Sequence, residues 1–184
     1  MNKKAFIFID GSNLYFKLKE FRKKLNKDLR LLNFNFRKFS EFLAGENEVV
    51  EIHYYIGAVK RQEGNQKSEK MYSDQQKLLG KLQQQKVITT MGVLIRHPDK
   101  TYHEKGVDVR LAVEMIRFAR QNKYDIAYLL SSDTDLVPAI EEVQAFGKAV
   151  QYVGFTKAQS FGLTVIANDI KLLRPEDIEQ FFEN

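Results

Sequence analysis

Short apolar runs alternate with longer amphipathic stretches along this chain, and no other feature constrains its fold more. Residues 5–9 and 126–130 are continuous runs of apolar side chains, a pattern typical of strands buried on both faces of a sheet. The intervening stretches carry apolar residues at helical spacing, most clearly from Asp108 onward, and this spacing predicts helices. Strands that alternate with helices indicate a parallel sheet with helices packed on both of its faces.

The alternation continues along the whole chain without a repeat, a low-complexity tract or a linker. We therefore expect one domain, residues 1–184, built as a three-layer α/β/α sandwich around a central, mostly parallel sheet. Residues 11–13 are expected to form a turn and residues 96–105 a polar loop. The other expected elements are strands at residues 49–58, 87–95, 149–153 and 170–173 and helices at residues 14–22, 36–43, 67–86, 136–146, 160–167 and from Pro175 onward.

The composition narrows the classes of function. The chain has no cysteine, which rules out disulfides, thiolate metal sites and a cysteine nucleophile. The first residues lack a signal-peptide pattern and no stretch is long and apolar enough to span a membrane, so we expect a cytoplasmic protein with no membrane partner. The formal net charge of +5 fits a polyanionic partner and equally fits ordinary surface solubility.

Four aspartates fall at the edge of the predicted sheet where its strands end. Asp10 directly follows the first apolar run, and Asp133 follows the run at residues 126–130 after two serines. Asp108 and Asp135 stand at the starts of two predicted helices. Right-handed crossovers place the carboxyl ends of parallel strands on one edge, where ligands bind. If the two apolar runs are neighbouring strands, the four carboxylates converge.

Carboxylates gathered in a small space repel each other and require a compensating cation at neutral pH. Mg²⁺ suits them, because it prefers oxygen ligands and is usually held by one or two carboxylates together with a substrate phosphate. Each residue also has a purely structural interpretation. Asp10 can end a strand in a turn, Asp108 and Asp135 can cap helices, Asp133 can accept hydrogen bonds from helix amides, and Asn13 can cap the first helix.

Three short blocks of the sequence occur in a recognisable order, at residues 8–15, 105–109 and 132–136. They resemble the signature blocks of the NYN domain family, in its LabA-like branch of the PIN-like nucleases. The similarity covers nearly the whole chain and is weak between residues 17 and 105. It implies a PIN-like α/β/α fold that cleaves RNA with Mg²⁺ or Mn²⁺ bound to acidic side chains.

The resemblance also implies roles for individual residues. Asp10, Asp108 and Asp133 would bind the metal, with Asp135 as a fourth acid or a supporting group. Asn13 would orient Asp10 or a metal-bound water. The catalytic set implied in this way is Asp10, Asn13, Asp108, Asp133 and Asp135. The chain departs from its relatives at Glu114, where they commonly have Asp, so no metal role is assigned to that residue.

Basic residues are expected to surround the acidic centre and to hold the phosphate backbone of RNA. Lys60 and Arg61 follow the second predicted strand, Arg96 and Lys105 follow the third, and Ser12 completes the expected RNA-binding set. The Lys and Arg side chains can equally be solvated loop residues. Three aromatic side chains offer a surface for a base, although packing is the interpretation that we favour for them: Tyr72, Tyr102 and Phe155.

The sequence thus predicts a divalent-metal-dependent ribonuclease. The main alternative is a non-catalytic RNA-binding or regulatory module on the same fold, which would bind RNA without metal and cleave nothing. The stretch from Asp133 to Asp135 also resembles the D-x-D motif of haloacid dehalogenase phosphohydrolases, but that motif ends their first strand and here it comes late. The long helix predicted at residues 67–86 can pack on the core or on a second copy of the chain, which leaves a homodimer open.

Overall fold

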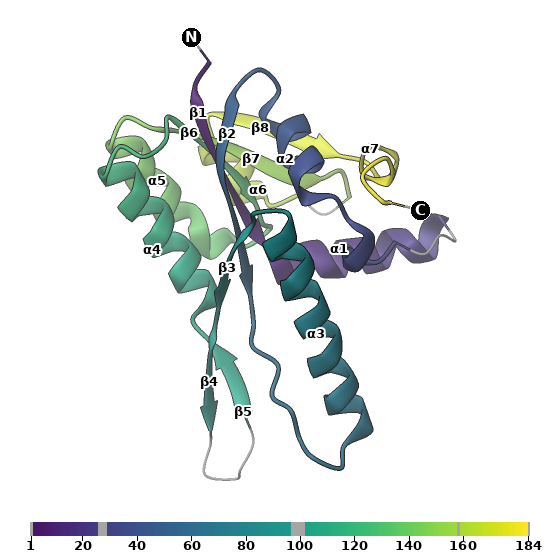
Figure 1. Ribbon diagram of the computed structural model, residues 1–184. Helices are drawn as coiled ribbons and strands as arrows, with labels where there is room; N and C mark the ends of the chain where they lie inside the picture. Colours follow the sequence, from purple (N-terminus) through teal and green to yellow (C-terminus); the bar gives the residue numbers. More distant parts are fainter. Residues whose placement is uncertain (1, 26–28, 97–101, 158, 184) are drawn as a thin grey trace.

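The centre of the protein is a six-stranded sheet in which all neighbouring strands run parallel (Figure 1). The computed structural model describes residues 2–25, 29–96, 102–157 and 159–183. The strand order is β3-β2-β1-β6-β7-β8. The strands are β1 (Lys4–Asp10), β2 (Glu48–Ile56), β3 (Ile88–Met91), β6 (Ile126–Leu130), β7 (Ala149–Phe155) and β8 (Asp169–Leu173).

Helices cover both faces of this sheet, which confirms the predicted three-layer α/β/α sandwich (Figure 1). One face carries α1 (Gly11–Leu25), α2 (Phe36–Ala44), α3 (Gln66–Gln84) and α7 (Pro175–Glu179). The other face carries α4 (Val107–Arg120), α5 (Val137–Ala145) and α6 (Phe161–Ile166). Short 3-10 turns, η1 (Leu31–Asn33) and η2 (Thr134–Leu136), complete the connections.

Strand β1 contributes to the apolar core on each side of the sheet. Ala5, Ile7 and Ile9 pack under α1 and α2, whereas Phe6 and Phe8 pack under α4. Successive side chains of a strand point to opposite faces, and both faces of β1 are covered, so the whole run is apolar. The same alternation places the last residue of the strand on the face of α4.

Several predicted elements agree with the structure. β6 spans Ile126–Leu130 as predicted, and it pairs directly with β1, with Ile9 opposite Leu130. The long helix α3 places Leu78 and Leu82 in the core of this chain. Within the described part of the chain, no helix combines the length and apolarity needed to cross a lipid bilayer.

The strand predicted at residues 87–95 is wrong, because two strands occupy this region. β3 joins the main sheet, while β4 (Val93–Arg96) pairs antiparallel with β5 (Tyr102–Lys105) in a separate ribbon that projects beyond the sheet (Figure 1). Gly92 separates the two strands, and its N–H donates to the carbonyl oxygen of Ile56 (3.0 Å) before the chain leaves the sheet. β5 lies within the predicted polar loop and lacks the apolar alternation on which strand prediction depends.

The turn predicted at residues 11–13 is also wrong, because α1 begins at Gly11 directly after β1. A Cβ atom at Gly11 would lie 2.5 Å from Cε1 of Tyr54 and 2.6 Å from the carbonyl oxygen of Tyr55. Glycine is therefore required here for the close approach of α1 to β2. This contact fixes the direction in which the first turn of α1 leaves the end of β1.

Candidate active site between β1 and β6

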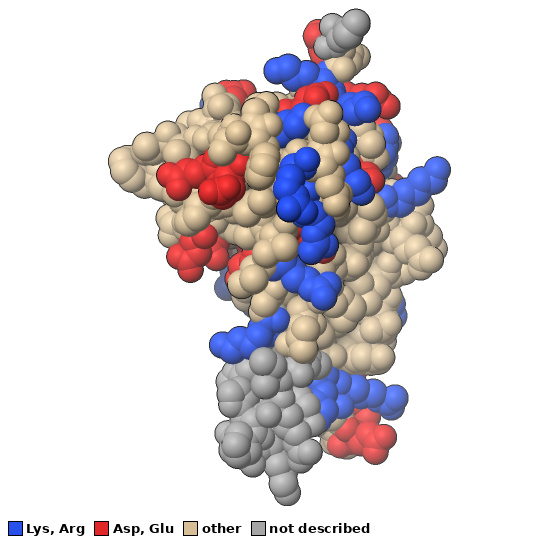
Figure 2. Space-filling view, turned by 90° about the vertical axis from the view of Figure 1, so that its left-hand side faces the viewer, with Lys and Arg blue, Asp and Glu red and all other residues tan. Residues whose placement is uncertain are grey.

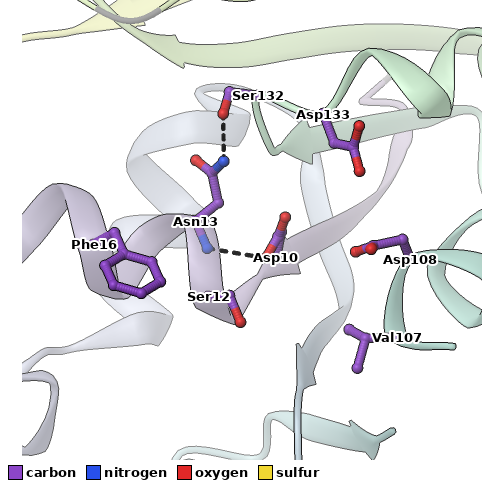
Figure 3. A pocket seen from close by; sticks show the side chains of 8 residues that line it. All are labelled: Asp10, Ser12, Asn13, Phe16, Val107, Asp108, Ser132 and Asp133. Atoms are coloured by element: carbon purple, nitrogen blue, oxygen red, sulfur yellow. Dashed lines mark hydrogen bonds between the residues drawn. The ribbon is translucent and has the colours of Figure 1, made fainter. Parts of the chain in front are cut away.

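The direction of strand addition reverses between β1 and β6. From β1 the chain builds outward through β2 and β3, and from β6 it builds outward on the other side through β7 and β8. Ligands of parallel α/β sheets bind at this point, beyond the carboxyl ends of the strands. A pocket of about 290 Å³ lies there (Figure 3), lined by Asp10, Ser12, Asn13, Phe16, Val107, Asp108, Ser132 and Asp133.

Asp10 ends β1 and is only 7% exposed. Its Oδ1 accepts a hydrogen bond from the backbone N–H of Asn13 (3.0 Å), and its Oδ2 accepts one from the hydroxyl of Ser131 (3.0 Å). Burial raises the pKa of this carboxyl, the hydrogen bonds from Asn13, Ser131 and Ser12 oppose that rise, and the nearby charge of Asp133 adds to it. The side chain is thus fixed in orientation and harder to ionise than an exposed aspartate.

Asp133 is held by the loop that follows β6. Its backbone N–H donates to Oγ of Ser131 (3.2 Å), the same hydroxyl that donates to Asp10. Its own Oδ1 accepts from the backbone N–H of Asp135 (3.0 Å), which makes Asp133 the N-cap of η2. Ser131 therefore couples the positions of the acidic residues from β1 and β6.

Asn13 links α1 to the same loop. Its Nδ2 donates to Oγ of Ser132. Its Oδ1 is buried and has no hydrogen-bond partner among the described residues, and such a buried acceptor normally finds a donor, a water or an ion. The side chain of Asn13 thus ties the start of α1 to the loop after β6.

Asp108 reaches the pocket from α4. Gly106, with φ of +85°, is the N-cap of this helix and turns the chain out of β5, so that Asp108 stands in the first helical turn and is exposed. Asp108 is therefore not the N-cap of this helix, although its position in the sequence suggested that role. Figure 3 shows the carboxylates of Asp10, Asp108 and Asp133 turned toward a common space. Three elements that are distant in sequence thus bring their acids to one pocket.

Two other acidic residues do not line the pocket. Asp135 is exposed in η2 and contributes its backbone N–H to Asp133. It is not a helix cap, since that position belongs to Asp133. Glu114 is half-buried farther along α4, where its Oε2 accepts from the hydroxyl of Tyr55 (2.8 Å). This contact gives Glu114 a structural partner on β2.

Of the expected RNA-binding residues, Ser12 lines the pocket, whereas Lys60, Arg61 and Lys105 do not. Lys105 is exposed at the end of β5, two residues before α4. After β2, Lys60 is half-buried and Arg61 is exposed, with its Nη2 3.7 Å from Oε1 of Glu69. The side chain of Arg96, at the end of β4, lies outside the described residues.

A basic column that sequence analysis did not identify crosses the side of the molecule covered by α4 and α5. Figure 2 shows Lys and Arg side chains in this column, with Asp and Glu side chains beside it. The exposed cations of α4 are Arg110, Arg117 and Arg120. Their spacing of seven and three residues places them on one helical face. This spacing is visible in the sequence and could have identified a basic helix face.

Two of the three aromatic residues considered from sequence, Tyr72 and Phe155, do not line the pocket. Phe155 is buried in the core, Tyr72 is half-buried on α3, and the side chain of Tyr102 lies outside the described residues. Phe16 lines the pocket instead. In the sequence, Phe16 does not share the helical face of Leu14, Leu18 and Phe21, by which α1 packs on the sheet. This position could have identified it as an exposed aromatic residue.

A solved structure shares the fold of this protein. The crystal structure of a protein of unknown function from Vibrio parahaemolyticus has the same fold, with a TM-score of 0.68 and 20% sequence identity over 99% of this chain and 97% of that one. Among curated proteins, none matches the chain. This likeness shows a shared α/β/α fold, which is consistent with a PIN-like sandwich.

The model of the NYN domain family matches residues 4–169. The chain belongs to the NYN domain family, which confirms the resemblance stated from its sequence blocks, and NYN domains are part of the PIN-like nuclease superfamily.

Proposed function

We propose that this protein is a divalent-metal-dependent ribonuclease that hydrolyses RNA phosphodiester bonds in the pocket between β1 and β6. The observation that carries the proposal is the convergence of Asp10, Asp108 and Asp133 on one pocket from β1, α4 and the loop after β6. Membership of the NYN family supports it, since that family belongs to the PIN-like nucleases.

The donors in the pocket fit Mg²⁺ or Mn²⁺. The carboxylates of Asp10, Asp108 and Asp133 are hard oxygen ligands, and cysteine is absent from the chain. Among the described residues, no group of three or more His, Asp or Glu side chains is close enough to enclose a metal. Mg²⁺ does not need such an enclosure, because it keeps several waters and uses one or two carboxylates plus substrate phosphate. When bound, it would supply Lewis-acid polarisation of the phosphodiester.

The residues of this chain orient the reacting groups. Asp10 is fixed by Asn13 and Ser131, and Asp133 is fixed by the N–H of Asp135. A carboxylate held in this way can accept a proton from a water molecule that attacks the phosphorus in line with the leaving oxygen. The product of such hydrolysis carries a 5′-phosphate, as in the class that the sequence resembles.

The surroundings of the pocket suit a polyanion. Lys105 stands near the start of α4, and Arg110, Arg117 and Arg120 are exposed along that helix. Cations on this side neutralise phosphates of a strand whose scissile bond lies among the acids. The formal net charge of +5 has the same sign.

A non-catalytic RNA-binding module is the second candidate. The observation that favours it is the lack of an enclosed three-ligand group among the described residues. Such a module would bind RNA equally with and without divalent metal. It gives no reason for a buried aspartate whose pKa is raised at the centre of the pocket.

A degradation assay with short and long end-labelled RNAs separates the two candidates. The purified protein is incubated with Mg²⁺, with Mn²⁺ and with EDTA, and products are resolved by length and tested for a 5′-phosphate. We expect cleavage with either metal and none with EDTA, because the carboxylates alone cannot offset the charge of the phosphodiester. Intact RNA under every metal condition, with RNA binding retained, would establish the binding module instead.

A further inference from the structure

Helix α1 presents two adjacent exposed aromatic side chains, one of which lines the pocket. Phe16 lines the pocket and is nevertheless 63% exposed, and the adjacent Tyr15 is 50% exposed. Their ring centroids lie 5.4 Å apart in an edge-to-face arrangement. Figure 3 shows the ring of Phe16 on the α1 side of the pocket, next to Asn13 and across from Asp108.

The packing of α1 on the sheet does not use these rings. Leu14, Leu18 and Phe21 form the buried stripe of the helix and lie in the core. Neither ring of the exposed pair is buried in this core. An exposed aromatic pair beside a pocket is a binding surface more often than an isolated exposed apolar residue is.

The same face of α1 continues into basic residues. Lys19 and Lys23 follow Phe16 by three and seven residues, so they share its helical face, and both are exposed. Aromatic rings next to cations suit a nucleic-acid strand, because the rings stack on bases while the cations neutralise phosphates. A protein partner would gain less from this mixture of charge and exposed rings at the mouth of an acidic pocket.

We propose that Phe16, supported edge-on by Tyr15, is a stacking platform for one unpaired nucleobase next to the scissile bond, while Lys19 and Lys23 contact phosphates of the same strand. The inference rests on the proposed function, since the base belongs to the RNA that the pocket would cleave. In an A-form duplex the faces of each base are covered by its neighbours. The platform therefore selects a strand that is single-stranded at this nucleotide, with little preference among bases, since every base has a π face.

Equilibrium binding to a short single-stranded RNA tests the platform, with fluorescence anisotropy as the readout. The variants are Phe16→Ala, Phe16→Tyr and Phe146→Ala, each in a protein that also carries Asp10→Asn so that the strand stays intact. Phe146 is the matched control, because it is 42% exposed at the end of α5, at the opposite edge of the sheet. A second series places 2-aminopurine at successive positions of the RNA, since its fluorescence is quenched when it stacks on a ring.

We expect Phe16→Ala to weaken binding about 5- to 100-fold and to remove the quenching at one position of the strand. Phe16→Tyr retains the ring and both signals, and Phe146→Ala binds like the parent. The melting temperature of Phe16→Ala stays near that of the parent because the ring is mostly exposed. A blunt RNA duplex binds the parent and Phe16→Ala equally.

Three results would overturn the platform: the same affinity and quenching in Phe16→Ala as in the parent, an equal loss of affinity for the duplex, or no quenching at any position in the parent. The first is also the result expected if the aromatic pair is a protein-binding surface. Neither readout depends on cleavage. A stacked base together with intact RNA in the degradation assay would refute the proposed ribonuclease activity and leave the platform standing.

Discussion

Asp10→Asn is expected to abolish RNA cleavage, with a loss of about a thousandfold or more in rate, which corresponds to about 4 kcal/mol of transition-state free energy. Asp10 is the most buried acid of the pocket and receives hydrogen bonds at both oxygens. Asn keeps the size and an acceptor oxygen but loses the charge that would attract a divalent cation. The measurement is the cleavage rate of a labelled RNA under saturating Mn²⁺.

The fold of the Asp10→Asn protein should be intact, because the side-chain oxygen of Asn can still accept the hydrogen bond from the backbone N–H of Asn13 in the first turn of α1, and Asn serves this role about as well as Asp. Burial raises the folded-state pKa of Asp10 above its ordinary value of 3.8. A raised carboxyl pKa means that stability is lost as the pH rises from this value through the folded-state pKa. At neutral pH without metal, the variant should therefore melt at or above the wild-type temperature.

A matched control separates charge loss at the pocket from charge loss in general. Asp169 is exposed at the start of β8, at the opposite edge of the sheet, and Asp169→Asn should cleave at the wild-type rate. Full Mn²⁺-dependent activity in folded Asp10→Asn would contradict the assignment of Asp10.

Gly11→Ala should be the most destabilising small substitution near the site. The added Cβ would lie 2.5 Å from Cε1 of Tyr54 and 2.6 Å from the backbone oxygen of Tyr55, and Tyr54 is fully buried. Overpacking of this kind costs about 1–3 kcal/mol. For a protein of this size each kcal/mol lowers the melting temperature by about 2–4 °C, which thermal unfolding followed by circular dichroism resolves.

Gly80→Ala provides the opposite expectation for the same chemical change. Gly80 lies within α3, and a Cβ there would meet no heavy atom within 4 Å. Because alanine favours a helix over glycine by about 0.5–1 kcal/mol, this variant should melt slightly above wild type. Equal melting temperatures for Gly11→Ala and wild type would show that α1 does not approach β2 as closely as described.

The layers of the fold and the meeting of the three acids could be predicted because they depend on topology alone. An apolar run identifies a buried strand, and a parallel sheet sends the end of every strand to one edge. Asp10 and Asp133 follow neighbouring strands and therefore had to be close. The same reasoning does not predict whether Asp135 points into the pocket. The direction of a side chain in η2 depends on local dihedral angles, which periodicity does not specify.

Other features depend on contacts between residues distant in sequence, which one sequence does not reveal. The sequence of β5 has no alternation of apolar and polar residues, so this strand resembled a loop. Ser131 joins Asp10 to the backbone of Asp133 through one hydroxyl, and nothing in its neighbours marks it. Phe16 differs, because its place off the buried stripe of α1 was visible before the structure was known.

Equilibrium Mn²⁺ binding, followed by electron paramagnetic resonance of the free ion, tests whether the three acids form one metal site. We expect saturable binding to the wild-type protein and to Asp169→Asn. Asp10→Asn, Asp108→Asn and Asp133→Asn should each weaken this binding by about tenfold or more, because each removes a charged oxygen from the same pocket. Mn²⁺ binding that is unchanged by all three substitutions, in proteins that remain folded, would contradict the shared metal site.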